Sequence, residues 1–262
     1  MTLEIACAFG FGLLIGSFAN VMIHRLPRMI LMEPSETPTH PIYNLNWPAS
    51  HCPHCLTPLK PWHNIPVLSY VGLKGQCAFC HHPINPLYPS IELAVGVIWA
   101  ACTWHWGLQP SSACWALFAT VLLVLSVIDY QTTLLPDDLT QTLVWTGLMA
   151  STMNWISIPA EQSIWGAMAG YGSLWIVATA FEKFTGRQGM GAGDFKLLAG
   201  LGAWLGPFAL LPLILIASVS GAVIGILLKL TQRINEEGHI PFGPFLAISG
   251  LMIAIFGIPA FA

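Results

Sequence analysis

The chain has 262 residues, of which 9 are Lys or Arg and 12 are Asp or Glu, so that charged residues make up only 8%. Soluble domains carry about 25% charged residues, and a water-soluble protein of this size could not cover its surface with so few. Hydrophobic residues reach 55% and the mean hydropathy is +0.68. The net charge of −3 offers no basic surface for nucleic acid. The composition therefore predicts an integral membrane protein.

Uncharged segments predict an all-α polytopic membrane protein with about eight transmembrane helices, since about 20 apolar residues cross a bilayer core. The expected spans are 5–24, 89–107, 111–129, 138–157, 162–182, two within 197–228, and 241–260. Segment 197–228 is divided because Gly206-Pro207 lies near its middle and because Lys196 and Lys229 at its two ends are both expected in the cytoplasm.

The basic residues orient these spans. No Lys or Arg precedes Ile23, whereas Arg25 and Arg28 follow the first span, which predicts a retained anchor with a periplasmic N-terminus. Eight spans then place every basic residue on the cytoplasmic side. These are Arg25, Arg28, Lys60, Lys74, Lys183, Arg187, Lys196, Lys229 and Arg233.

Residues 25–88 form a Pro-rich cytoplasmic insert between the first two spans. The expected division of the chain is thus a first helix at 1–24, the insert at 25–88 and a seven-helix membrane domain at 89–262. The insert holds Cys52-x-x-Cys55 and Cys77-x-x-Cys80, and the 21 residues between the two pairs nearly match the spacing of a zinc ribbon. Four thiolates leave no open coordination position, so a structural zinc ion is expected. Disulfides are the alternative, which a reducing cytoplasm disfavours, and a flanking His could replace one thiolate.

Two carboxylates lie at the cytoplasmic ends of apolar spans, where ionisable groups are costly. Asp129 ends one apolar run, and Asp194 lies in the sequence Gly191-Ala-Gly-Asp194. Two carboxylates at one depth on different helices predict a catalytic pair, in which one holds a proton and the other acts as a base on water. Solvation at the interface is the alternative. Glu92 could pair with Arg25 as an anchor or belong to a site.

Several collinear blocks resemble the bacterial type 4 prepilin peptidases, the bifunctional prepilin leader peptidase/N-methyltransferases. They are residues 12–21 (GLLIGSFANV), 25–27 (RLP), the two Cys pairs, 64–69 (NIPVLS), 73–77 (LKGQC), 88–92 (YPSIE), 128–137 (IDYQTTLLPD), 189–198 (GMGAGDFKLL) and 240–245 (IPFGPF). The resemblance implies an inner-membrane aspartic endopeptidase of the GxGD class, with Asp129 and Asp194 as its catalytic pair.

The resemblance also implies substrates and a second activity. The substrates would be type IV prepilins and type II secretion pseudopilins, cut on the cytoplasmic side of the membrane. The family commonly methylates the new N-terminal residue with S-adenosylmethionine, although no residue here predicts where that donor would bind. The family commonly has Arg before Tyr-Pro, whereas this chain has Leu87. A transporter with relay carboxylates and a membrane scaffold that binds a partner are the alternatives, and the oligomeric state is not predicted.

Overall fold

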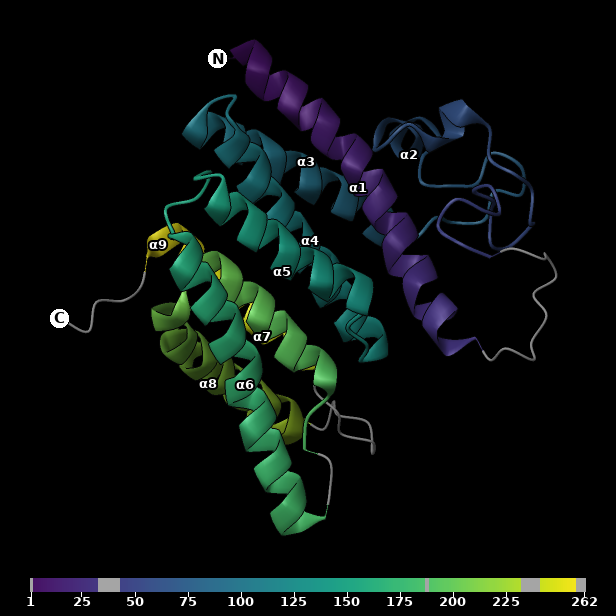
Figure 1. The fold of residues 1–262 in the computed structure, drawn as a ribbon. Coiled ribbons are helices and arrows are strands. Elements are labelled where there is room, and N and C mark those ends of the chain that lie inside the picture. The colour runs from purple at the N-terminus through teal and green to yellow at the C-terminus, as the bar shows by residue number, and fades with distance from the viewer. Residues whose placement is uncertain (1, 33–42, 187–188, 232–240, 258–262) are drawn as a thin grey trace. The chain divides into compact units, whose positions relative to one another are not determined.

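The computed structural model describes residues 2–32, 43–186, 189–231 and 241–257, and the regular secondary structure of these ranges is helical throughout (Figure 1). The all-α prediction is therefore confirmed. The long helices are α1 (Thr2–Leu31), α3 (Leu87–Trp106), α4 (Pro110–Thr132), α5 (Asp137–Thr152), α6 (Ala160–Thr185), α7 (Ala192–Leu205), α8 (Leu210–Leu230) and α9 (Gly243–Phe256). The short elements are η1 (Pro61–Asn64), α2 (Leu68–Gly72) and η2 (Pro207–Ala209).

Within the described ranges, five helical segments are long and apolar enough to cross a membrane. They are Thr2–Leu31, Leu87–Trp106, Pro110–Thr132, Ala160–Thr185 and Pro207–Leu230. Helices α5, α7 and α9 have 16, 14 and 14 residues, fewer than the roughly 17–25 that a membrane-spanning helix needs. The architecture is thus that of a multi-pass membrane protein, and the number of crossings stays a prediction.

The helix boundaries differ from the expected spans, and the largest difference is at the end of α1. Helix α1 does not stop at residue 24 but continues through Pro27 to Leu31, because the charged side chain of Arg25 folds onto the insert and leaves the backbone helical. Helix α5 ends at Thr152, before the expected residue 157. The predicted break within 197–228 is present, since α7 ends at Leu205 and Gly206 adopts φ +78°. The expected positions of Arg187, Arg233 and residues 258–260 lie outside the described residues.

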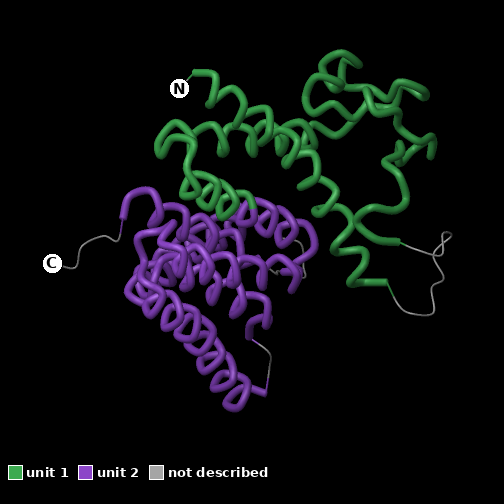
Figure 2. Tube along the Cα trace, turned by 45° about the horizontal axis from the view of Figure 1, so that its top comes forward, with its two compact units in different colours: residues 1–120 green, residues 121–262 purple. Residues whose placement is uncertain are grey.

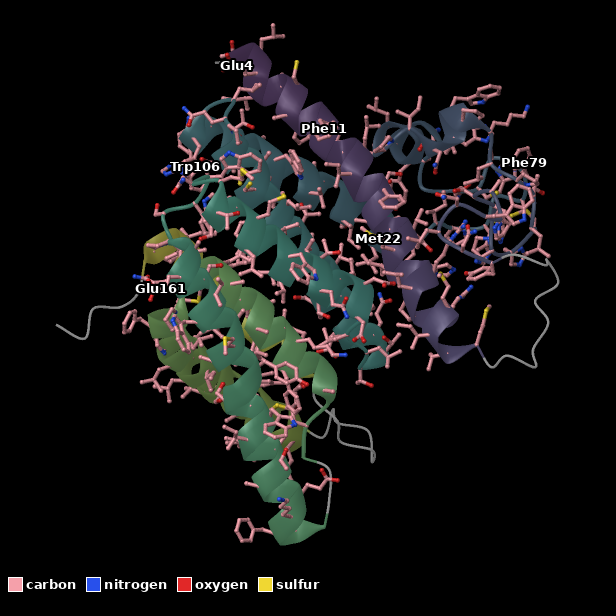
Figure 3. The ribbon with its side chains drawn as sticks, viewed as in Figure 1. Glu4, Phe11, Met22, Phe79, Trp106 and Glu161 are labelled. Carbon is pink, nitrogen blue, oxygen red and sulfur yellow. The ribbon has the colours of Figure 1, made fainter. Side chains whose placement is uncertain are left out.

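The chain forms two compact units, residues 1–120 and residues 121–262 (Figure 2). In the first unit, α1 and α3 pack antiparallel along a seam of small residues. A Cβ atom added to Gly12 would lie 2.9 Å from the Cα of Gly96, and one added to Gly16 would lie 2.7 Å from the Cα of Glu92. One turn further on, Asn20 donates to the carbonyl of Tyr88 at 3.0 Å. Figure 3 shows Glu4 of α1 and Trp106 of α3 toward the same end of this pair.

The second unit is organised around α7, in which every residue from Leu197 to Leu205 is buried. Helix α6 runs antiparallel to it, with Gly166 and Gly202 so close that a Cβ on either would meet the other's backbone carbonyl. Helix α5 runs parallel to α7, because Leu143 packs on Gly200 and Gly147 packs on Trp204 one turn later. The α5 and α7 helices therefore begin on the same side of the unit.

Candidate functional site

The four cysteines of the insert form one cluster. The sulfur atoms of Cys52, Cys55, Cys77 and Cys80 all lie within 4.8 Å of one another, and those of Cys52 and Cys80 are 3.9 Å apart. A tetrahedral zinc site with bonds of about 2.3 Å has sulfur–sulfur edges of about 3.8 Å, whereas a disulfide bond needs about 2.05 Å. All four cysteines are free. The geometry fits a metal site with four cysteine ligands and not the disulfide alternative.

Two matching turns of the backbone supply these ligands. The amide of Leu56 donates to the carbonyl of Cys52 at 2.9 Å, and the amide of His81 donates to the carbonyl of Cys77 at 3.0 Å. Both Leu56 and His81 have a positive φ, at 56° and 57°. Each Cys pair thus lies on one tight turn, so that the sequence spacing itself aims both sulfurs of a pair at one point.

The electrostatics of the cluster call for a cation. Hydrogen bonds from the side chain and the backbone of Thr57 lower the pKa of the Cys55 thiol to about 6. A backbone hydrogen bond from His82 lowers the pKa of Cys80, but burial and the three neighbouring thiols outweigh it and raise that pKa to about 11. The four thiols cannot all ionise beside one another unless a metal ion compensates their charge.

Histidines surround the cluster without joining it. Among the described residues, the group of converging ligand atoms contains only the four sulfurs. His54 and His82 stack on each other with ring centroids 4.3 Å apart, and His63 packs edge-on against Phe79, which Figure 3 places on the insert. The expectation that a His could replace a thiolate therefore has no support in this geometry.

Arg25 and Glu92 tie the insert to α1 and α3 separately. Arg25 is only 8% exposed and donates to the carbonyls of Asn44, Leu45 and Pro48 at 2.9, 3.2 and 2.6 Å. Glu92 accepts the backbone N–H of Val67 at 2.8 Å. Each side chain therefore binds insert backbone, and the pairing of Glu92 with Arg25 that the sequence left open is not formed.

The second cluster contains Asp129, near the C-terminal end of α4, and Asp194, in the first turn of α7. Asp129 is 4% exposed, and the two carboxylates lie close enough for their charges to repel each other. The Oδ1 atom of Asp194 is buried and has no hydrogen-bond donor among the described residues. The structure thus brings together the two carboxylates that the sequence singled out.

The loop between α4 and α5 packs against residues that adjoin the two carboxylates. A Cβ added to Gly193 would lie 2.7 Å from the Cβ of Leu135, and one added to Gly243 would lie 3.3 Å from the Cδ2 of the same leucine. Leu135 therefore packs beside Asp194 on one side and beside the start of α9 on the other. Gly193 has no side chain because the loop approaches the backbone of α7 at this point.

Two contacts near the carboxylates did not follow from the sequence. The backbone N–H of Gly243 donates to Oδ2 of Asp129 at 2.9 Å. Lys196 donates to both oxygens of Asp137, 59 positions away in the sequence, at 2.6 and 2.8 Å. The family-like motif at residues 240–245 pointed to Gly243, but it does not predict a contact with Asp129, which lies 114 positions away in the sequence.

The fold and the geometry define a class: an all-helical membrane protein with two neighbouring aspartates, Asp129 buried and Asp194 half-buried, and a cluster of four cysteines. Comparison with known proteins gives the family. Residues 11–106 match the Bacterial Peptidase A24 N-terminal domain, and residues 116–226 match the Type IV leader peptidase family.

Relatives match across nearly the whole chain. A "Prepilin leader peptidase/N-methyltransferase" of Stutzerimonas stutzeri is 41% identical over 97% of this chain and 91% of its own length. Proteins of the same name from Pseudomonas aeruginosa and Neisseria gonorrhoeae are 40% and 39% identical over 97% and 92% of this chain, and over 90% and 87% of their own lengths. No solved structure matches the chain. The chain belongs to the prepilin leader peptidase/N-methyltransferase family, which confirms the resemblance, and the transporter alternative has no support.

Proposed function

We propose that the protein is an aspartic endopeptidase of the inner membrane that removes the leader peptide from type IV prepilins and type II secretion pseudopilins. The single observation that carries the proposal is the pairing of Asp129 and Asp194 at the ends of α4 and α7. The matched family and the names of the relatives support it independently.

The chemistry follows from two carboxylates that share a site. Because like charges close together cannot both ionise easily, one carboxyl keeps a proton while the other takes a proton from water. The water oxygen then attacks the scissile carbonyl carbon, and the protonated carboxyl donates to the carbonyl oxygen. A prepilin is itself a membrane helix with a charged leader, so lateral diffusion would deliver its scissile bond at the depth of the pair.

The proposed topology has eight spans, a periplasmic N-terminus and a cytoplasmic active site. Its support is the distribution of Lys and Arg along the sequence. The functional division proposed is the helix at 1–24, the insert at 25–88 and the catalytic membrane domain at 89–262. Labelling of single cysteines placed at residues 60 and 161 from the two sides of the membrane tests this arrangement, which requires the first to react only from the cytoplasm.

We propose that Cys52, Cys55, Cys77 and Cys80 hold a structural zinc ion. The near-tetrahedral spacing of the sulfurs and the two matched turns support this proposal. When bound, zinc would offset part of the negative charge of the thiolates and close the loop of 21 residues between the two Cys pairs.

The names of the relatives support N-methylation of the new N-terminus as a second activity, with S-adenosylmethionine as the donor. The residues of the first unit do not identify its site. A cavity of about 280 Å³ lies beside α1, and none of the described side chains that line it is ionisable. The lining residues are Leu14, Ser17, Phe18, Val21, Asn64 and Pro66. Mass analysis of the mature pilin N-terminus tests this activity.

Leader removal from a co-expressed prepilin tests the peptidase. Asp129→Asn and Asp194→Asn should each lower cleavage by roughly three orders of magnitude, because each removes a group that must exchange a proton. Asp138→Asn is the matched control, since this aspartate in the first turn of α5 is exposed, whereas Asp129 is buried. Processing at the normal rate by either of the first two variants, at normal protein levels in the membrane, would disprove the proposal.

A further inference from the structure

The two aspartates of the candidate site have different surroundings. Asp129 accepts the N–H of Gly243, the first residue of α9, at 2.9 Å. The first N–H groups of a helix have no partner within the helix, and the helix dipole adds positive potential there. A hydrogen-bond donor at this place stabilises the ionised form of a carboxylate.

Gly243 is the residue type that this contact requires. A Cβ atom added to it would lie 2.5 Å from Oδ2 of Asp129, far inside ordinary van der Waals contact. Gly243 is buried, so the backbone could not move away into solvent. The absence of a side chain is therefore a condition for the hydrogen bond.

Asp194 has the opposite environment. Its Oδ1 is buried and finds no donor in the described part of the chain, and an ionised carboxylate left in that state would carry a large desolvation cost. The nearby cation Lys196 is engaged by both oxygens of Asp137. Among the described residues no donor compensates a charge on Oδ1 of Asp194, and a proton on this carboxyl removes that charge.

From these contacts we propose that Gly243 is a positioning residue that keeps Asp129 ionised, so that Asp129 is the base and Asp194 carries the proton in the resting enzyme. The inference rests on the proposed peptidase function and specifies how its two carboxylates differ.

The assignment fixes the path of each proton. Asp129 takes a proton from water as the water oxygen bonds to the scissile carbonyl carbon, and the carbonyl oxygen receives the proton of Asp194. Asp129 then returns its proton to the amide nitrogen as the C–N bond breaks. Asp194 recovers a proton from one hydroxyl of the intermediate, which becomes the new carboxyl group. Both aspartates end in their starting states.

Infrared difference spectroscopy on the purified full-length protein locates the resting proton without substrate. At neutral pH, the absorption of a protonated carboxyl group should be lost in Asp194→Asn and retained in Asp129→Asn. Loss in Asp129→Asn with retention in Asp194→Asn, or equal loss in both variants, would overturn the assignment. Cleavage that persists in both variants would instead disprove the peptidase function, so the two failures are distinguishable.

A substitution at Gly243 tests its positioning role. Gly243→Ala should lower kcat about tenfold and move the acid limb of the pH–rate profile about one unit higher, because ionised Asp129 loses a hydrogen bond. Gly221→Ala is the control, since its added methyl would face Phe245 of α9 at an ordinary 3.5 Å and should leave the profile unchanged. An unshifted acid limb in Gly243→Ala would refute the role, and if that variant does not accumulate, the infrared comparison still decides.

Discussion

The four cysteines and the two aspartates are brought together in opposite ways. Cys52 and Cys80 lie 28 positions apart and meet through two similar turns in one insert. Asp129 and Gly243 lie 114 positions apart and meet where the start of α9 reaches the C-terminal end of α4. Local backbone geometry builds the first site, whereas helix packing builds the second. The two sites should therefore respond to different substitutions, and leader cleavage and bound zinc measure them separately.

The largest loss of cleavage outside the carboxylates themselves is expected where α6 and α7 touch. Gly202→Ala places a methyl group against the backbone carbonyl of Gly166, which cannot rotate away, and overpacking of this kind costs about 1–3 kcal/mol. Thermal unfolding in detergent and cleavage assays should both show the loss, while zinc per chain stays unchanged. Gly172→Ala is the control, because its added methyl meets nothing within 4 Å. A parallel loss of zinc would mean that the sites are not independent.

A smaller effect is expected from the ion pair beside the two carboxylates. Lys196 and Asp137 have side chains 30% and 57% exposed, and exposed pairs contribute about 0.2–1 kcal/mol. Lys196→Met should lower cleavage by about two- to fivefold, and the charge exchange Lys196→Asp with Asp137→Lys should restore part of it. A loss as large as that of Asp194→Asn would place Lys196 in the chemistry itself.

The smallest effect on cleavage is expected from loss of the metal. Cys52→Ser combined with Cys77→Ser should lower zinc from about one per chain to none, because each turn loses a ligand. Cleavage should remain within about threefold of wild type, since no cysteine of the insert belongs to the unit that holds Asp129 and Asp194. Cys102→Ser serves as the control, because Cys102 lies in α3 outside the cluster. Cleavage abolished together with zinc would contradict the separation of the two sites.

Features that depend on local sequence could be predicted from the sequence. The Cys cluster could be predicted because two CxxC turns determine where their sulfurs point. Asp129 and Asp194 could be predicted as site residues because an ionisable group at the end of an apolar segment is energetically costly. The break at Gly206 could be predicted because Lys196 and Lys229, both expected in the cytoplasm, require the chain to turn back.

Contacts between helices that are distant in the sequence could not be predicted from it. Pairing of Lys196 with Asp137 depends on the parallel packing of α5 and α7, which neither sequence segment records alone. The hydrogen-bond donor of Gly243 is its backbone N–H, so no side chain in the sequence predicts its contact with Asp129. The end of α1 at Leu31 was missed because Pro27 and Arg25 both indicate a boundary in sequence, whereas the helix continues past them.

The parallel course of α5 and α7 has a consequence for the transition state. Their first turns and the start of α9 all adjoin Leu135 or the Asp137–Lys196 pair, so three helix N-termini lie near the carboxylates, and the N–H of Gly243 in α9 donates to Asp129. Each carries partial positive charge from backbone N–H groups. When water adds to the scissile carbonyl, negative charge builds on oxygen, and the backbone already provides a field of the opposite sign. Part of the catalytic power would then reside in helix orientation, which substitution of side chains cannot remove.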